Sequence, residues 1–126
     1  MRWVVDGMNV IGSRPTGWWR DRPGAMRELV EELDSLAERS GDPVTVVLDG
    51  RPFELEGGPG VSVQFASRRG PNAADDDIAA IAALVESDPD PADLSVVTSD
   101  RDLARRVRDA GATVVGAGEF RRRLDG

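Results

Sequence analysis

Short apolar runs alternate along the chain with segments in which apolar residues recur at helical spacing. Five such runs are rich in β-branched residues, and each is followed within three residues by an aspartate, glycine or serine, as strands are. The runs cover residues 2–5, 44–48, 61–65, 94–97 and 113–115. Most are continuously apolar rather than alternating, which is typical of strands that are buried on both faces of a parallel sheet.

Helical periodicity fills most of the intervals between these runs. Pro23 suits the first turn of a helix that ends at Gly41, and Asn72 suits the cap of a second helix. A third helix ends at Gly111, and a final helical turn is predicted over 119–124. The remaining segments are predicted as loops or turns: 12–22, 51–60, 67–71 and 88–91.

Strands that alternate with helices predict a doubly wound α/β fold around a parallel sheet of five strands. The chain has 126 residues, which is the size of one ordinary domain, and it shows no internal repeat and no low-complexity linker. We therefore predict a single domain over residues 1–126.

Composition narrows the chemistry that this domain can perform. The chain has no cysteine and no histidine, which excludes disulfides, thiolate sites, histidine metal sites and serine–histidine triads. Its net charge is −7, and all 16 basic residues are arginine. A net acidic protein binds nucleic acid only through local arginine patches or bound cations. No apolar run is long enough for a signal peptide or a membrane span, so the expected location is the cytoplasm.

Three of the predicted strands end at an aspartate: Asp6, Asp49 and Asp100. An aspartate at one strand end is explained by the turn that follows it. Three such residues carry more weight, because the carboxyl ends of parallel strands share one edge, where ligands bind. This edge is the predicted active site.

A run of three aspartates, Asp75 to Asp77, opens the helix after the third strand. The helix dipole favours acidic residues there by about 0.3–1 kcal/mol each, which is a sufficient local reason for one of them. The helical wheel places Asp75 and Asp77 beside the apolar face and Asp76 opposite it. Carboxylates gathered at one edge repel each other, and a Mg²⁺ or Mn²⁺ ion relieves that repulsion while activating water for phosphodiester hydrolysis.

Polar side chains near these aspartates are candidates for substrate contact. Asn9 follows Asp6 by three residues and is suited either to hold a phosphate, a metal-bound water or a carboxylate, or to cap its own loop. Thr98 and Ser99 are suited to hydrogen-bond to phosphate, to support Asp100, or simply to complete the end of their strand. Arg14 lies on the predicted edge.

Two further arginines, Arg68 and Arg69, immediately precede the acidic helix and are predicted to bind phosphate. The adjacent residues Trp18 and Trp19 are suited either to stack on unpaired bases or to cover the first helix as a hydrophobic lid.

Four segments resemble the motifs of NYN domains, which are PIN-like nucleases, and the resemblance is closest to the YacP-type branch. They are V-V-D-G-M-N-V-I-G (4–12), V-V-L-D-G (46–50), A-D-D-D-I-A-A (74–80) and T-S-D-R-D-L (98–103). The segments occur in the family's order and span nearly the whole chain.

The resemblance implies strand order 3-2-1-4-5, an endoribonuclease, and Mg²⁺ or Mn²⁺ held by Asp6, Asp75 and Asp100. Asn9, from its place after Asp6, and Asp49, from its strand end and a family match, are also predicted at the catalytic centre. Single-stranded or looped RNA is the expected substrate, because exposed bases and backbone can reach a shallow edge. The pattern of flap-type nucleases adds Asp76 as a ligand, although the helical wheel turns this residue away.

Other functions stay open on the sequence. A catalytically silent module of the same fold would bind RNA or protein, and many PIN domains are toxins that pair with an antitoxin. A ribosome and a second copy of the chain are further expected partners. A phosphatase of the haloacid dehalogenase type needs an aspartate two residues after Asp6, where this chain has Met8.

Overall fold

Five parallel strands form the centre of the structure, a computed structural model that describes residues 1–68, 70, 72–85 and 93–125. The sheet has the order β3-β2-β1-β4-β5, and every neighbouring pair is parallel. The predicted fold and strand order are therefore confirmed. The strands are β1 (Arg2–Asp6), β2 (Val44–Leu48), β3 (Val61–Phe65), β4 (Leu94–Val97) and β5 (Thr113–Val115).

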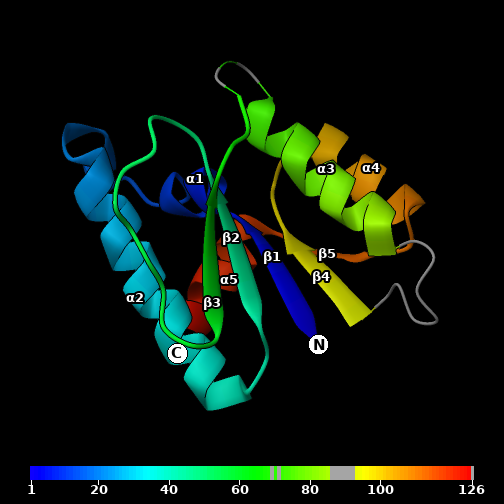
Figure 1. The fold of residues 1–126 in the computed structure, drawn as a ribbon, viewed down its shortest axis with the longest axis horizontal. Helices are drawn as coiled ribbons and strands as arrows, with labels where there is room; N and C mark the ends of the chain where they lie inside the picture. Colours follow the sequence, from blue (N-terminus) through cyan, green and yellow to red (C-terminus); the bar gives the residue numbers. More distant parts are fainter. Residues whose placement is uncertain (69, 71, 86–92, 126) are drawn as a thin grey trace.

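Helices cover both faces of this sheet, and Figure 1 shows α2 on one side with α3 and α4 on the other. One core joins the sheet to α1, α2 and α5, and a second joins it to α3 and α4. The helices are α1 (Gly7–Ile11), the 3-10 turn η1 (Trp18–Arg20), α2 (Arg22–Ser40), α3 (Ala73–Val85), α4 (Arg101–Asp109) and α5 (Ala117–Asp125). Among the described residues, no helix is both long and apolar enough to cross a membrane.

Successive residues of β1 supply both cores, which explains why its sequence is continuously apolar. Val4 belongs to the core under α3 and α4, whereas Val5 belongs to the core under α1 and α2. Both are almost fully buried. Burial of such a side chain contributes roughly 1.5–3 kcal/mol, so the sheet is held from both sides.

Two helices go beyond what the sequence pattern predicts. No helix is predicted directly after β1, where the helix α1 begins at Gly7 without an intervening loop. The helix α5 spans nine residues rather than a single turn over 119–124. Phe120, which is fully buried and lies 5.4 Å from the ring of Trp3, fixes α5 against the sheet. The turn predicted over 88–91 lies outside the described residues.

The other predicted boundaries follow local rules. The carboxylate of Asp21 caps α2 by accepting a 3.1 Å hydrogen bond from the backbone of Gly24. Gly41 ends α2 with a φ of 73°, the left-handed conformation that glycine adopts without a steric penalty. Asn72 also has a positive φ of 64° immediately before α3, a conformation that asparagine tolerates.

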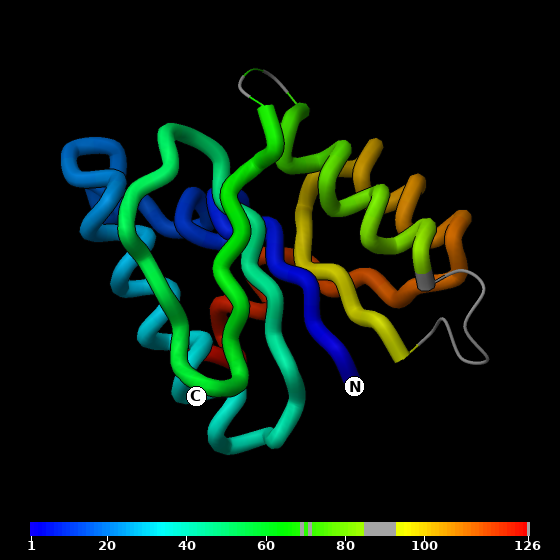
Figure 2. Tube along the Cα trace, in the orientation of Figure 1, coloured from blue at the N-terminus to red at the C-terminus, as the bar shows by residue number. Residues whose placement is uncertain are grey.

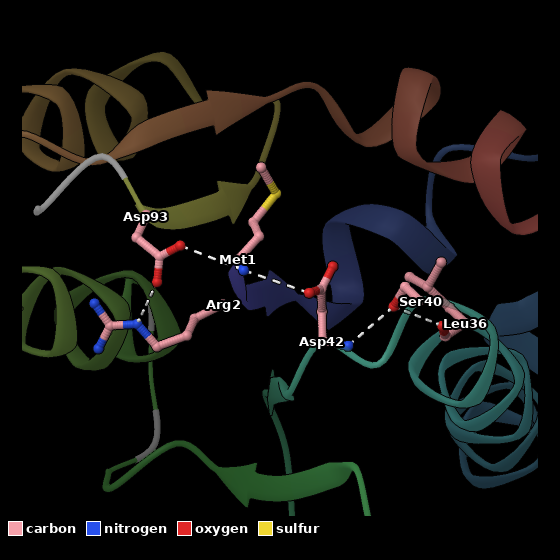
Figure 3. A network of polar contacts seen from close by, with 6 residues as sticks. All are labelled: Met1, Arg2, Leu36, Ser40, Asp42 and Asp93. Carbon is pink, nitrogen blue, oxygen red and sulfur yellow. Dashed lines mark hydrogen bonds and ion pairs between the residues drawn. The ribbon is translucent and has the colours of Figure 1, made fainter.

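Charged groups form ion pairs at the edge of the sheet where β1 begins (Figure 3). The terminal ammonium of Met1 lies 3.3 Å from carboxylate oxygens of both Asp42 and Asp93, and Arg2 pairs with Asp93 at 3.3 Å. Hydrogen bonds to these two carboxylates raise the pKa of the ammonium. Asp42 and Asp93, the acidic residues of this edge, are therefore matched by cations.

Candidate active site

Asp6 is the last residue of β1 and lies directly before α1. Asp6 is only 5% exposed to solvent. Gly7 makes this sharp change of direction possible, because a Cβ there would lie 2.4 Å from a methyl group of Leu48 and 3.1 Å from the carbonyl oxygen of Val47. Only a residue without a side chain allows the end of β1 to lie this close to β2. The carboxylate is thereby set at the sheet edge.

The pKa of Asp6 is raised to about 6. Burial is the largest cause and the carboxylates of Asp75 and Asp49 act in the same direction, whereas hydrogen bonds from Thr98 and from the backbone of Asn9 lower the pKa. A carboxylate that is both desolvated and surrounded by like charges is a poor structural element. It is well suited to binding a cation.

Thr98 connects Asp6 to Asp100. Its hydroxyl donates a 3.0 Å hydrogen bond to the carboxylate of Asp6 and accepts a 3.1 Å hydrogen bond from the backbone N–H of Asp100. Asp100 is the N-cap of α4, and its carboxylate accepts from the backbone of Leu103 at 2.9 Å. Thr98 is 1% exposed, so its hydroxyl acts inside the protein rather than on a substrate. The alternative in which Thr98 supports Asp100 is the one that this geometry favours.

Asn9 and Ser99 form a second cross-link at this edge. The backbone N–H of Ser99 donates to the side-chain oxygen of Asn9 at 2.9 Å, and the Ser99 hydroxyl accepts from the backbone of Ala117 at 2.9 Å. These contacts tie α1 and α5 to the turn between β4 and α4. Both side chains therefore hold the turn that carries Asp100.

Asp75 and Asp49 complete an acidic cluster. Asp75 lies in the first turn of α3 and Asp49 directly follows β2. Burial raises the pKa of Asp75, the carboxylates of Asp100 and Asp49 raise it further, and Arg106 lowers it. In Figure 2 the chain leaves β1, β2 and β3 at one edge, where α3 begins. The structure thus brings Asp6, Asp49, Asp75 and Asp100 to the same edge of the sheet.

Asp76 has a different environment from its neighbour Asp75. Its carboxylate accepts hydrogen bonds from the guanidinium groups of Arg68 and Arg106, the second at 3.0 Å. These bonds lower the pKa of Asp76. The predicted metal ligand Asp76 and the predicted phosphate-binding Arg68 are therefore paired with each other. Asp77 also has a structural contact, since it accepts from the backbone and hydroxyl of Ser67 at 2.6 and 2.7 Å.

The remaining predicted substrate contacts do not gather at the acidic cluster. Arg14 pairs with Asp125 of α5 at 3.2 Å and lines a small pocket together with Glu28, Glu32 and Arg121. Arg69 lies outside the described residues. Of the predicted arginines, Arg68 is the one that the structure places beside Asp75 and Asp100.

The two tryptophans after α1 have separate roles. Trp18 is half-buried and packs against the core, with the guanidinium of Arg22 5.6 Å from its ring. Trp19 is 55% exposed, and Arg20 lies 6.0 Å from its ring. Trp18 is therefore the hydrophobic lid, and Trp19 is the aromatic surface that a ligand can reach.

An open pocket of about 350 Å³ lies beside the acidic cluster. It is lined by Arg68, Asn72, Asp75, Asp76, Asp100, Asp102, Leu103, Arg105 and Arg106. The atoms of this pocket that can coordinate a metal are oxygen atoms of carboxylates and amides, which suit Mg²⁺ or Mn²⁺ rather than a softer metal. Within the described part of the chain, no three acidic side chains are arranged closely enough to enclose a metal ion without adjustment.

Comparison with known proteins agrees with this architecture. The family model of the YacP-like NYN domain matches residues 3–126. No curated protein sequence matches the chain. The crystal structure of Rae1 (YacP) from Bacillus subtilis is similar, with a TM-score of 0.79 and 23% identity over 99% of this chain and 74% of that chain. The W164L mutant of Rae1 gives 0.80 and 24% over 98% and 74%.

At this level of identity the two crystal structures show the fold alone. The family match covers nearly the entire chain, and NYN domains are a family of nucleases. The resemblance predicted from the four motifs is confirmed, and the chain belongs to the YacP-like NYN domain family.

Proposed function

We propose that the protein is a metal-dependent endoribonuclease that hydrolyses phosphodiester bonds at its acidic edge. The observation that carries this proposal is the group of Asp6, Asp49, Asp75 and Asp100 at one edge of the sheet. The carboxylates of Asp75 and Asp49 raise the pKa of Asp6, and those of Asp100 and Asp49 raise the pKa of Asp75. Carboxylates that lie close together without enough cationic partners destabilise a fold unless a bound ligand compensates their charge. A divalent cation is the ligand that fits oxygen donors of this kind.

Asp6, Asp75 and Asp100 would hold the Mg²⁺ or Mn²⁺ ion. When bound, such an ion lowers the pKa of water and stabilises the negative charge that develops during hydrolysis. The chain itself supplies the alignment: Thr98 fixes Asp6 relative to Asp100, and Asn9 fixes the turn that carries Asp100. Asp49 contributes a further carboxylate to orient the attacking water.

Two features support RNA with unpaired bases as the substrate. The exposed ring of Trp19 offers a surface on which a base can stack, an interaction worth about 1–3 kcal/mol per base. The acidic pocket is partly open to solvent, which gives a strand access to its carboxylates. Arg68, beside this pocket, is available to a phosphate when the strand displaces it from Asp76.

The test is cleavage of a fluorescently labelled RNA hairpin with a long loop, in Mn²⁺ with and without a chelator. We expect the wild type to cut within the loop, the chelator to stop it, and Asp6→Asn and Asp100→Asn to lose activity. Asp109→Asn, an exposed change at the far end of α4, is the matched control and should cut like the wild type. Equal cleavage by the wild type and both active-site variants would contradict the proposal. A DNA hairpin of the same sequence tests the preference for RNA.

One observation favours a second candidate, a module that binds RNA without cutting it. In the described residues the carboxylates do not yet enclose a metal ion. If the wild type binds the hairpin but leaves it intact in Mn²⁺, this second function replaces the first. The same result with a co-purifying protein inhibitor would instead indicate a nuclease toxin held by its antitoxin.

A further inference from the structure

A second pocket adjoins the acidic one on the β5 side of Asp100. It has a volume of about 540 Å³ and an open mouth. Its lining consists of Thr98, Ser99, Asp100, Arg101, Ala104, Arg108, Val114 and Gly116. We call it the α4–β5 groove. Because Asp100 lines both pockets, the groove leads directly to the acidic cluster.

The groove and the acidic pocket differ in charge. Two arginines and one aspartate line the groove, whereas three arginines and four aspartates line the acidic pocket. In the acidic pocket Arg68 and Arg106 both pair with Asp76, and Arg105 lies 3.6 Å from Asp102. In the part of the chain that the structure describes, Arg101 and Arg108 form no comparable ion pair. The groove therefore has a net positive lining in a protein whose net charge is −7.

The positions of Arg101 and Arg108 suit an extended polyanion. They lie seven residues apart on α4, so they project from the same face of the helix roughly 10 Å apart along its axis. Ala104 lies between them, and its small side chain leaves space for a ligand in the groove. On the opposite wall, Gly116 has no side chain, and even an added Cβ would remain 3.8 Å from the Ser99 hydroxyl.

We propose that the α4–β5 groove binds the phosphates of the RNA strand that flank the scissile bond. The inference rests on the proposed function, because it assumes that the strand reaches Asp100. Arginine holds phosphate through its planar fork of donors and reads no base in doing so. The groove thus explains how a net acidic protein holds a polyanion: strand affinity comes from Arg101 and Arg108, in a groove that adjoins the cation-binding carboxylates at Asp100.

The experiment measures RNA binding separately from cleavage. All proteins carry Asp6→Asn, and binding of a fluorescent oligouridylate is followed by anisotropy across a salt series from about 50 to about 200 mM. Arg101→Gln with Arg108→Gln is the test variant. Arg39→Gln with Arg123→Gln is the matched control, since it removes two exposed arginines from α2 and α5. Arg101→Lys with Arg108→Lys keeps both charges.

We expect the test variant to bind on the order of tenfold more weakly than the control at low salt. The slope of log affinity against log salt should fall by about 0.7 for each arginine removed, or about 1.4 in total. The lysine variant should keep the slope, which also shows that the groove residues are not needed for folding. Equal affinity and slope in the test and control variants would overturn the proposal, as would the absence of RNA binding by the parent protein.

Failure of the proposed function gives a different result. If the protein with Asp6 intact never cleaves RNA while the test variant still loses affinity and slope, the groove stands and the nuclease does not. If RNA is cleaved but the groove variant binds and cuts like the control, the nuclease stands and the groove does not.

Discussion

Thr98 donates a 3.0 Å hydrogen bond to the carboxylate of Asp6, and both residues are buried. This bond favours the ionised form of Asp6 against the effect of burial. The same hydroxyl accepts the backbone N–H of Asp100, so one side chain sets the relative position of two proposed ligands. Thr98 is in this sense a positioning residue.

Replacing Thr98 by valine keeps the shape of the side chain and removes the hydroxyl. We expect the pKa of Asp6 to rise, because the interaction that lowers it is lost. The acidic limb of the pH–rate profile in Mn²⁺ should therefore move to higher pH. Since the N–H of Asp100 also loses its partner, unfolding should become easier by about 1–3 kcal/mol in urea titrations. Thr98→Ser should restore the profile, and an unchanged acidic limb in Thr98→Val would refute the positioning role.

Asp6 should make the metal-free protein less stable as the pH rises. Its pKa is about 6 in the folded protein, against 3.8 for the unperturbed group. Between these values the folded state holds a proton that the unfolded state has released, so the free energy of unfolding falls as the pH increases. At about pH 7 the penalty approaches 3 kcal/mol, from about 1.4 kcal/mol for each pKa unit.

Asp6→Asn removes this ionisation and should abolish the penalty. Urea unfolding in a chelator should show similar stabilities for the wild type and the variant at about pH 4, with the variant more stable at about pH 7. Asp109→Asn serves as the control for loss of one carboxylate at an exposed position. A variant that is no more stable than the wild type at the higher pH would contradict the proposed burial of charge.

Asp76 should behave as an anchor for arginine rather than as a metal ligand. Its carboxylate accepts from Arg68 and Arg106, and its side chain is 43% exposed. Asp76→Asn should change stability by less than about 1 kcal/mol, as exposed ion pairs do. It should retain Mn²⁺-dependent cleavage and bind RNA more tightly, because two guanidinium groups are released. Loss of cleavage as complete as that of Asp75→Asn would instead make Asp76 a ligand.

Trp18 and Trp19 should respond differently to truncation. Trp19→Ala removes an exposed ring and should weaken RNA binding by about 1–3 kcal/mol with little change in thermal stability. Trp18→Ala removes a ring that packs on the core and should lower the thermal midpoint. The two variants control for each other because they delete the same side chain one residue apart. If Trp19→Ala binds oligouridylate as tightly as the wild type, Trp19 is not a stacking surface.

The strands follow from the sequence because burial on both faces leaves a clear signal, whereas their order was implied only by the resemblance to NYN domains. Val4 and Val5 belong to different cores, and this two-sided burial makes β1 continuously apolar. The aspartates at the ends of β1 and β4 were visible for the related reason that a charged residue interrupts an apolar run.

The short helix α1 and the long-range ion pairs could not be predicted from the order of apolar and polar residues along the chain. The helix α1 is only five residues long and follows β1 without a loop, so it has too few turns to show periodicity. The ion pairs of Asp76 with Arg68 and Arg106 join residues 8 and 30 positions apart. The contact of Arg14 with Asp125 spans 111 positions. Such pairings arise only once the sheet has assembled.

Gly7 offers no donor, acceptor or charge, yet the spacing between β1 and β2 depends on it. In a saturation mutagenesis screen scored by activity, position 7 should therefore group with the aspartates of the edge. A parallel screen scored by protein abundance should separate them, because any side chain at Gly7 pushes against Leu48 and the backbone of Val47, whereas amide replacements of the aspartates preserve the packing. The two screens together would show that activity depends on the space left free at Gly7 as strictly as on the carboxylates themselves.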